Sequence, residues 1–318
     1  MLAGDGRRRY QVCGEFYMKR WQTILLVLVS LTVLLGGYVF LQIRTIEVER
    51  LSDDLYVLRG FGGNTAVLRT DAGTVVVDTM SLPAQGGWIR ELAKELTGAD
   101  TVLLINTHYH LDHTHGNPAF EPGTRILSTE RTLSHLHALD AEFWTGDAAK
   151  LLPNETFSER QTLHIGGKTI ELVHPGPGHT DGDLVVIFAD ENVIHMGDLA
   201  FKDHYPNIDL EAGGTVRGWP ATLDNVLALD FDRVIPGHGL TTDRQGIRQF
   251  QTFLSELAEI GRQAAEQGIS LEDTRATDQL TSDAGYEPIR FIISLGLDRE
   301  FVLQRAWEEA TGNFTRTN

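Results

Sequence analysis

The sequence predicts an α+β fold in which two β-sheets pack together with helices outside, preceded by a membrane-spanning helix and followed by a helical tail. Two sets of short β-rich runs are each followed by helical patterns, which is typical of layered sheets and helices. An uncharged apolar run stands near the N-terminus. Of the 318 residues, 42% are hydrophobic and 22% charged, as in an ordinary globular chain. The length suits one large domain or two small ones.

The N-terminal segment predicts a single-pass membrane anchor. Residues 21–43 carry no charge, and at 1.5 Å per residue they span a bilayer core of about 30 Å. Five Lys or Arg lie in residues 1–20, so we expect this segment in the cytoplasm and residues 45–318 outside it, at the cytoplasmic (inner) membrane and in the periplasm of a Gram-negative cell. A cleaved signal peptide is the alternative, but the run exceeds the usual apolar region. Met18 is an alternative start.

Charge and cysteine content exclude several classes of protein. The first 44 residues hold six of the 27 Lys/Arg and two of the 44 Asp/Glu, so residues 45–318 have a formal net charge of −21. We therefore expect no nucleic-acid partner, since such a partner requires a basic surface. Cys13 is the single cysteine, which excludes an intramolecular disulfide and a cysteine zinc cluster.

The elements follow in order along residues 45–318. Short β-rich runs separated by glycine-containing turns predict strands at 55–58, 65–68 and 74–77. A helix at 87–96 follows, then strands at 101–106 and 125–128 and a mainly helical stretch at 129–150. The second set repeats the scheme with strands at 162–165, 169–173, 183–188 and 192–196, a helix from 219 and a strand at 233–235. Amphipathic patterns at 247–260 and 287–311 predict a helical extension. We expect a hydrolase-like domain at 45–245 and this extension, 246–318, packed on it.

All twelve histidines lie between His108 and His238, and four of them fall within eight residues. The dense stretch, THYHLDHTHGN at 107–117, directly follows the predicted strand 101–106. His108 and His110 are two apart and can reach one metal from an extended segment. Asp112 and His113 come after the chain has turned and can face a second metal. Imidazole and carboxylate groups are zinc ligands, so this loop predicts a metal site.

Three later segments repeat the same arrangement. His179 follows the strand 169–173, Asp198 follows 192–196 and His238 follows 233–235, each next to glycine. Glycine lets the backbone turn tightly beside a crowded site. Each residue alone is a weak signal, but their order after the histidine cluster is a strong one.

Together these residues resemble the metallo-β-lactamase superfamily. His108-x-His110-x-Asp112-His113 matches its HxHxDH signature. The resemblance implies a four-layer αββα sandwich with two Zn²⁺ at one edge of the sheets, with iron or manganese as alternative metals. It implies that His108, His110 and His179 hold one zinc. Asp112, His113 and His238 would hold the other, and Asp198 would bridge both.

We accordingly expect a membrane-anchored dinuclear zinc hydrolase in which a metal-bridging hydroxide attacks the carbonyl of a β-lactam, lactone or ester-like substrate. Asp112 would be the catalytic residue that orients the hydroxide and moves its proton. Two zinc ions, two aspartates and a hydroxide leave a charge of +1, which favours an anionic small molecule. Asp198 stands where orthodox β-lactamases have Cys or Ser, so β-lactamase activity is not assured. A glyoxalase-II-like thioesterase and a non-catalytic, zinc-binding, membrane-tethered scaffold are the alternatives.

Five further residues are candidates for the surroundings of the metals or for substrate contact. Asp78, which ends the strand 74–77, can hold a ligating histidine through its second nitrogen, and Thr180 can act similarly. His115 lies two residues beyond the cluster. Lys202 and Tyr205 follow Asp198 on a loop that we expect to overhang the metals, where Lys202 can pair with a substrate carboxylate.

Overall fold

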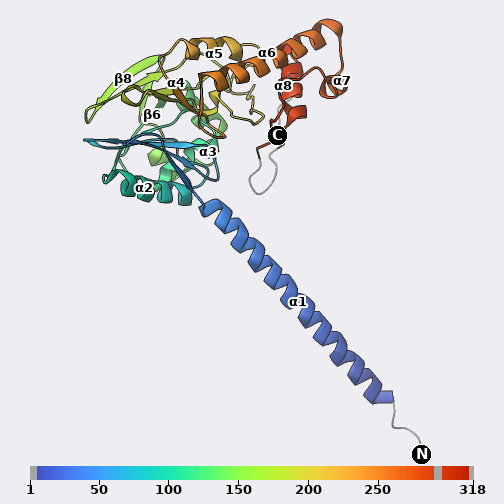
Figure 1. Ribbon diagram of the computed structural model, residues 1–318. Helices are drawn as coiled ribbons and strands as arrows, with labels where there is room; N and C mark the ends of the chain where they lie inside the picture. The colour runs from blue at the N-terminus through green and yellow to red at the C-terminus, as the bar shows by residue number, and fades with distance from the viewer. Residues whose placement is uncertain (1–5, 290–295, 315–318) are drawn as a thin grey trace, which may run out of the picture. The chain divides into compact units, whose positions relative to one another are not determined.

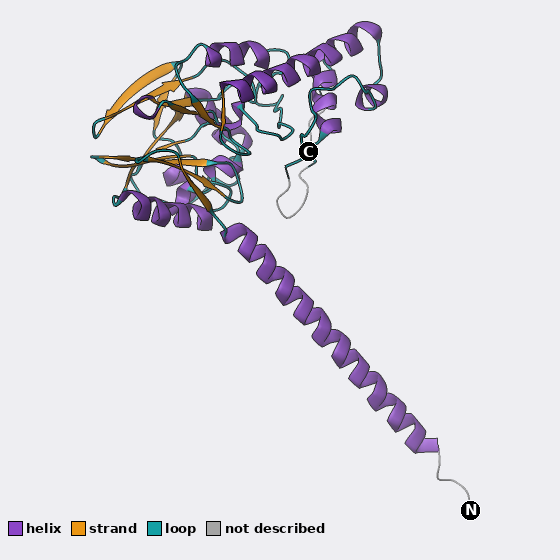
Figure 2. Ribbon diagram, in the orientation of Figure 1, coloured by secondary structure: helices purple, strands orange, loops and turns teal. Residues whose placement is uncertain are grey.

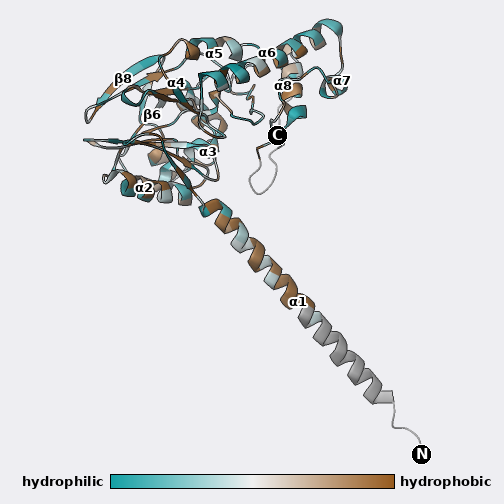
Figure 3. Ribbon diagram, in the orientation of Figure 1, coloured by the Kyte–Doolittle hydropathy of each residue, from teal (hydrophilic) through white to brown (hydrophobic). Residues whose placement is uncertain are grey.

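The computed structural model describes residues 6–289 and 296–314 and divides the chain into two compact units, Met1–Thr45 and Ile46–Asn318. The first unit is a helix, α1 (Gly6–Arg44). Its segment Ile24–Arg44 has a mean hydropathy of 2.6 and contains no buried residue, and it forms the mostly brown part of α1 in Figure 3. A helix of this length and composition can cross a membrane or serve as a signal sequence.

The second unit contains two sheets, drawn as separate orange layers in Figure 2. The first sheet runs in sequence order, β1 (Glu47–Arg50), β2 (Leu55–Arg59), β3 (Thr65–Thr70), β4 (Gly73–Val77), β5 (Thr101–Ile105), β6 (Arg125–Thr129) and β7 (Glu155–Phe157). Strands β1 to β4 form an antiparallel meander, and β4 to β7 pair in parallel.

The second sheet has the order β13-β12-β11-β10-β9-β8. Its strands are β8 (Arg160–Ile165), β9 (Lys168–Val173), β10 (Val185–Phe188), β11 (Val193–His195), β12 (Arg233–Ile235) and β13 (Thr242–Asp243). The pair β11 and β12 is parallel, whereas the other pairs are antiparallel.

Alternate residues of the strands bury their side chains on opposite faces, as the twofold period of a strand requires. In β4, Val75 and Val77 join a core that also contains Val186 and Phe188 of β10, so the two sheets pack on each other. Val76 instead points to a second core beneath the first sheet. The central strands are apolar on both faces because one face of each sheet packs against the other sheet and the opposite face packs against helices.

Helices cover the outer faces of the sheets (Figure 1). The helix α2 (Pro83–Thr97) contributes Ile89 and Ala93 to the core beneath the first sheet. Over the second sheet lie α5 (Trp219–Leu227), α6 (Arg244–Gln267) and α8 (Arg299–Thr311), whose apolar residues share one core with the outer residues of β10 and β11. The remaining helices are short, namely α3 (Leu111–Thr114), α4 (Glu130–Leu139) and α7 (Leu271–Arg275), with 3-10 turns at Asn117–Ala119, Ala148–Leu151, Ala189–Glu191 and Gly197–Leu199.

The predicted sheets and helices are confirmed, although α2 begins four residues before the predicted start at 87 and two other predicted helices are shorter than expected. The stretch 129–150 is helical only through Leu139, because Asp140 leaves the helical conformation at the C-cap. In the tail, the helix predicted from 287 begins at Arg299, where the Asp298 side chain accepts a hydrogen bond from the Phe301 N–H and caps it. Residues 290–295 of that prediction lie outside the described part. Strands β1, β7 and β13 are too short and too polar to have been predicted.

Candidate metal centre

The ends of four strands bring predicted ligands to one edge of the sheets, and the end of a fifth brings Asp78. His108 follows β5, and Asp78 follows its parallel neighbour β4. Asp198 follows β11 and His238 follows its parallel neighbour β12. His179 follows β9, which runs in the same direction as β11 because two antiparallel pairings separate them. Carboxyl ends of strands that run alike meet at the same edge.

A single helical turn places the other three ligands. His110 is the N-cap of α3, and Asp112 and His113 lie inside this four-residue helix. The turn changes the direction of the chain, so the His110 side chain faces one way and those of Asp112 and His113 the other. The six-residue pattern HxHxDH therefore contributes to two neighbouring groups of side chains.

One group of coordinating atoms comprises His108, His110, His179 and Asp198, all within 4.8 Å of one another. His179 Nε2 lies 2.8 Å from His110 Nδ1. Asp198 Oδ2 lies 3.7 Å from His179 Nε2 and 3.9 Å from His108 Nε2. These three histidines are the ones that the resemblance assigns to one metal.

The second group comprises Asp112, His113 and His238, again within 4.8 Å. His238 Nε2 lies 3.1 Å from Asp112 Oδ2, and His113 Nε2 lies 3.6 Å from the same oxygen. The other carboxylate oxygen of Asp198, Oδ1, lies 3.1 Å from His113 Nε2 and 3.5 Å from His238 Nε2. Asp198 thus presents one oxygen to each group.

Unpaired buried atoms test whether this donor set suits a metal. Among the described residues, His108 Nε2, His113 Nε2 and Asp198 Oδ1 are buried without a hydrogen-bond partner. Such atoms are rare in native proteins and call for a ligand. Imidazole nitrogens and carboxylate oxygens that converge at these distances are the donors zinc prefers, so the residues fit a pair of metal ions.

Burial and neighbouring charges shift the pKa of one histidine in each group in opposite directions. Burial and the neighbouring His110 lower the pKa of His179 to about 4, so this imidazole is neutral, which is the form that binds a metal. Burial opposes the charged form of His238 as well, but Asp198 and a hydrogen bond to Asp112 outweigh it and raise its pKa to about 9. The two carboxylates therefore hold a positive charge in the second group, and a bound cation can take that role.

Asp78 holds the second group in place from behind. This carboxylate is fully buried and lies at the end of β4 with φ of 62°, a conformation that Asp and Asn tolerate better than most residues. Its Oδ2 accepts hydrogen bonds from His113 Nδ1 at 2.7 Å and from Thr107 Oγ1 at 2.8 Å, and its Oδ1 accepts one from the Thr107 N–H at 2.8 Å. The proton on Nδ1 leaves His113 Nε2 free to bind a metal.

The loop 207–212 holds the first group, and sequence reasoning missed it. Asp209 Oδ2 accepts hydrogen bonds from His110 Nε2 at 3.0 Å and from the Tyr109 hydroxyl. The Asn207 carbonyl accepts one from His179 Nδ1 at 2.8 Å. This loop contains no glycine and does not directly follow a strand, so no local pattern distinguished Asp209 from the other aspartates of the chain.

The other four predicted surrounding residues point to different partners. His115 pairs with Asp140 at 2.8 Å and stacks on Phe143. Thr180 donates to Asp183, and Lys202 pairs with the adjacent Asp203 at 2.7 Å. Tyr205 is buried in the core over the second sheet and donates to Asp283. The loop after Asp198 therefore turns Lys202 and Tyr205 toward their own neighbours rather than toward the ligands.

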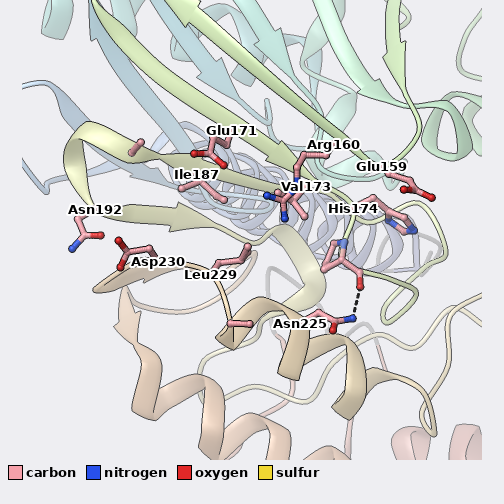
Figure 4. A pocket seen from close by; sticks show the side chains of 13 residues that line it. Glu159, Arg160, Glu171, Val173, His174, Ile187, Asn192, Asn225, Leu229 and Asp230 are labelled. Carbon is pink, nitrogen blue, oxygen red and sulfur yellow. Dashed lines mark hydrogen bonds between the residues drawn. The ribbon is translucent and has the colours of Figure 1, made fainter.

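A cavity of about 260 Å³ opens on the ligands. His110, Asp112, Asp198 and His238 line it together with side chains of several loops, namely Phe61, Ser81, Leu111, Phe201, Asn207, Ile289 and Leu297. A larger cavity, about 700 Å³, lies on the outer face of the second sheet between β9 and α5, with Glu171, His174 and Asn225 among its lining (Figure 4). Its described lining contains none of the predicted ligands, so of these two cavities only the smaller one opens on them.

Residues 58–238 match the model of the metallo-β-lactamase superfamily, so the chain belongs to that family, whose members are metal-dependent hydrolases. The α subunit of a 2,4-dinitroanisole O-demethylase from Nocardioides sp. is 26% identical, over 70% of this chain and 67% of its own. A type 2 metallo-β-lactamase from Bacillus sp. is 29% identical, over 63% and 79%. The structure of a metallo-β-lactamase from Pontibacter korlensis has a similar fold, with a TM-score of 0.59, 21% identity, and 66% and 99% coverage.

Proposed function

We propose that this protein is a membrane-anchored dinuclear zinc hydrolase that cleaves a carbonyl compound such as a β-lactam, a lactone or an ester. The observation that carries the proposal is the division of seven donors into two groups on either side of Asp198. Two adjacent cations need such a bridging carboxylate because it offsets their mutual repulsion.

Bound zinc would supply a water activated near neutral pH and would polarise the substrate carbonyl. Three aspartates would move the proton and orient the ligating histidines. Asp112 Oδ2 faces both His113 and His238 at 3.6 and 3.1 Å and also lines the cavity, so it can hold and move a proton at the edge where substrate enters. Asp78 and Asp209 orient His113 and His110 from behind.

We also propose a division of labour along the chain. Residues 1–20 would be cytoplasmic, 21–43 would anchor the protein in the inner membrane, and 45–245 would form the hydrolase outside the cytoplasm with 246–318 packed on it. The apolar exposed segment Ile24–Arg44 supports the anchor. Three separate cores, one between the sheets and one outside each, support a four-layer αββα sandwich.

The central test removes one ligand. In the full-length protein in lipid nanodiscs, His110→Ala should lose both bound metal and hydrolysis, because His110 Nδ1 lies within the first group. His164→Ala is the matched control, since His164 is exposed on β8. Metal content is measured by mass spectrometry. Full activity of a metal-free His110→Ala protein would refute the proposal.

The substrate panel separates the alternatives. It contains a chromogenic cephalosporin, a lactone, a neutral ester, a thioester and 2,4-dinitroanisole, the last because a relative is named for demethylating it. Preference for the thioester would favour the glyoxalase-II-like alternative. Two metals per chain with no turnover of any substrate would favour the non-catalytic scaffold.

A further inference from the structure

The wall of the metal cavity is apolar. Five of its described lining side chains are hydrophobic and come from four separate parts of the chain, Phe61, Leu111, Phe201, Ile289 and Leu297. Phe201 is buried and lies nearly parallel to the His238 ring, with ring centroids 5.4 Å apart. Apart from Ser81 and Asn207, the polar lining consists of the predicted metal ligands.

The described lining away from the proposed metals offers no positive charge to an anionic group of the substrate. Among the described residues that line the cavity there is no Lys or Arg. Lys202, the nearest sequence candidate, pairs with Asp203. A substrate carboxylate against the described apolar wall, away from the proposed metals, would lose its hydration without a cationic side chain of that wall to replace it, which is costly.

Two of the five wall residues come from the C-terminal part of the chain, beyond the family match that ends at residue 238. Ile289 belongs to the core over the second sheet, and the half-buried Leu297 packs against the same core. Both are thus packed in a core to which α5, α6 and α8 contribute. The C-terminal extension completes the cavity that the shared part of the fold leaves open.

We propose that this cavity binds an uncharged alkyl or aryl group of the substrate, and that Ile289 and Leu297 set its preferred size. The inference rests on the proposed hydrolase and narrows its substrate to neutral esters or lactones with a short apolar group. The volume, about 260 Å³, lies just below the usual range of small-molecule sites, about 300–1,000 Å³, which limits the cavity to a small group. Each methylene that enters should raise kcat/KM about fourfold until the cavity is full.

The test uses 4-nitrophenyl esters with acyl chains of two to eight carbons and the full-length protein in nanodiscs. The wild type should show the fourfold rise per methylene over the shorter chains, followed by a plateau, and should prefer a neutral ester to a succinyl ester of equal length. Leu297→Gln makes the wall polar and should flatten the rise, and Ile289→Val should reduce it slightly. The effect should fall mainly on KM, since the apolar contact is made before the reaction.

Leu229→Gln is the matched control, because Leu229 is also half-buried against the same core but lines the distant cavity of Figure 4. Leu229→Gln should retain the wild-type rise of kcat/KM with each methylene. Because esters partition equally into the lipid around both variants, a difference between them reports on the cavity. An equal rise in wild type and Leu297→Gln, or preference for the succinyl ester, would overturn the inference.

The inference can be judged even if no ester is hydrolysed, which would count against the proposed function alone. Calorimetry on the metal-free protein with straight-chain alcohols of two to eight carbons measures the cavity directly. Affinity should rise with each methylene in the wild type and in Leu229→Gln, and the rise should be lost in Leu297→Gln. If the affinity of the wild type does not increase with alcohol length, the cavity is not an apolar binding site and the inference is wrong.

Discussion

Replacing Asp78 by Asn tests how the second group of ligands is organised. The carboxylate accepts from His113 Nδ1 and from both the N–H and the hydroxyl of Thr107. Asn keeps the shape and tolerates the positive φ, but its NH₂ group can only donate. The Thr107 hydroxyl adapts by rotating. His113 adapts only by moving its proton from Nδ1 to Nε2, the atom that faces Asp198 and Asp112.

A protonated Nε2 cannot bind a metal, so we expect Asp78→Asn to weaken metal binding at the second group. Loss of such a supporting hydrogen bond lowers metal affinity by about 10–100-fold, or about 1.4–2.7 kcal/mol. The stability of the metal-free protein should fall by only about 1–3 kcal/mol, the cost of one unsatisfied buried group. Hydrolysis should fall with metal occupancy.

Competition with a chromogenic chelator measures the two metal affinities, and urea unfolding measures stability. The matched control is Asp54→Asn, which removes a carboxylate that pairs with Arg69 and Lys168 in a more exposed position. Asp54→Asn should bind both metals normally. If Asp78→Asn binds them with the same affinity as Asp54→Asn, the tautomer of His113 does not depend on Asp78 and our account of this group is wrong.

Three further predictions follow from the contacts of the site. Gly237→Ala should lose metal and destabilise the protein by about 1–3 kcal/mol, because its Cβ would lie 2.0 Å from Asp198 Oδ1; normal metal content would contradict this. Asp209→Ala should weaken metal binding through His110, checked by the same chelator competition. Burial raises the pKa of Asp183 to about 7, so the folded state holds an extra proton between about pH 4 and 7 and stability should fall as pH rises through this window. Urea midpoints of metal-free wild type should fall relative to Asp183→Asn over that range, and parallel profiles would refute the assignment.

The candidate ligands that the structure brings together could be predicted from the sequence because their signals are local. The spacing of His108, His110, Asp112 and His113 is set within one strand end and one helical turn, so a short window contains the geometry. His179, Asp198 and His238 each follow a recognisable apolar strand. Most of the strands were predictable for the same reason, since a short apolar run bounded by turn residues is a local signal for a buried strand.

The partners of the ligands depended on contacts between distant loops. Asp209 supports His110 across about 100 residues of chain, and Asn207 supports His179 through a backbone carbonyl that any residue would supply. Lys202 and Tyr205 lie close to Asp198 in sequence, yet the fold turns them toward Asp203 and Asp283. In a loop, closeness to Asp198 in the sequence does not determine whether a side chain points toward it.

The sequence by itself therefore determined the class of fold, the apolar N-terminal helix and the residue types that can bind metal, because periodicity and spacing act over a few residues. Only the tertiary structure decided that Asp198 faces both groups and that Ile289 and Leu297 reach the cavity. The first relation arises from strand ends that meet at one edge of the sheets, and the second from the core that α5, α6 and α8 form over the second sheet. Packing depends on the shapes of side chains that meet from remote parts of the chain, and no local pattern encodes it.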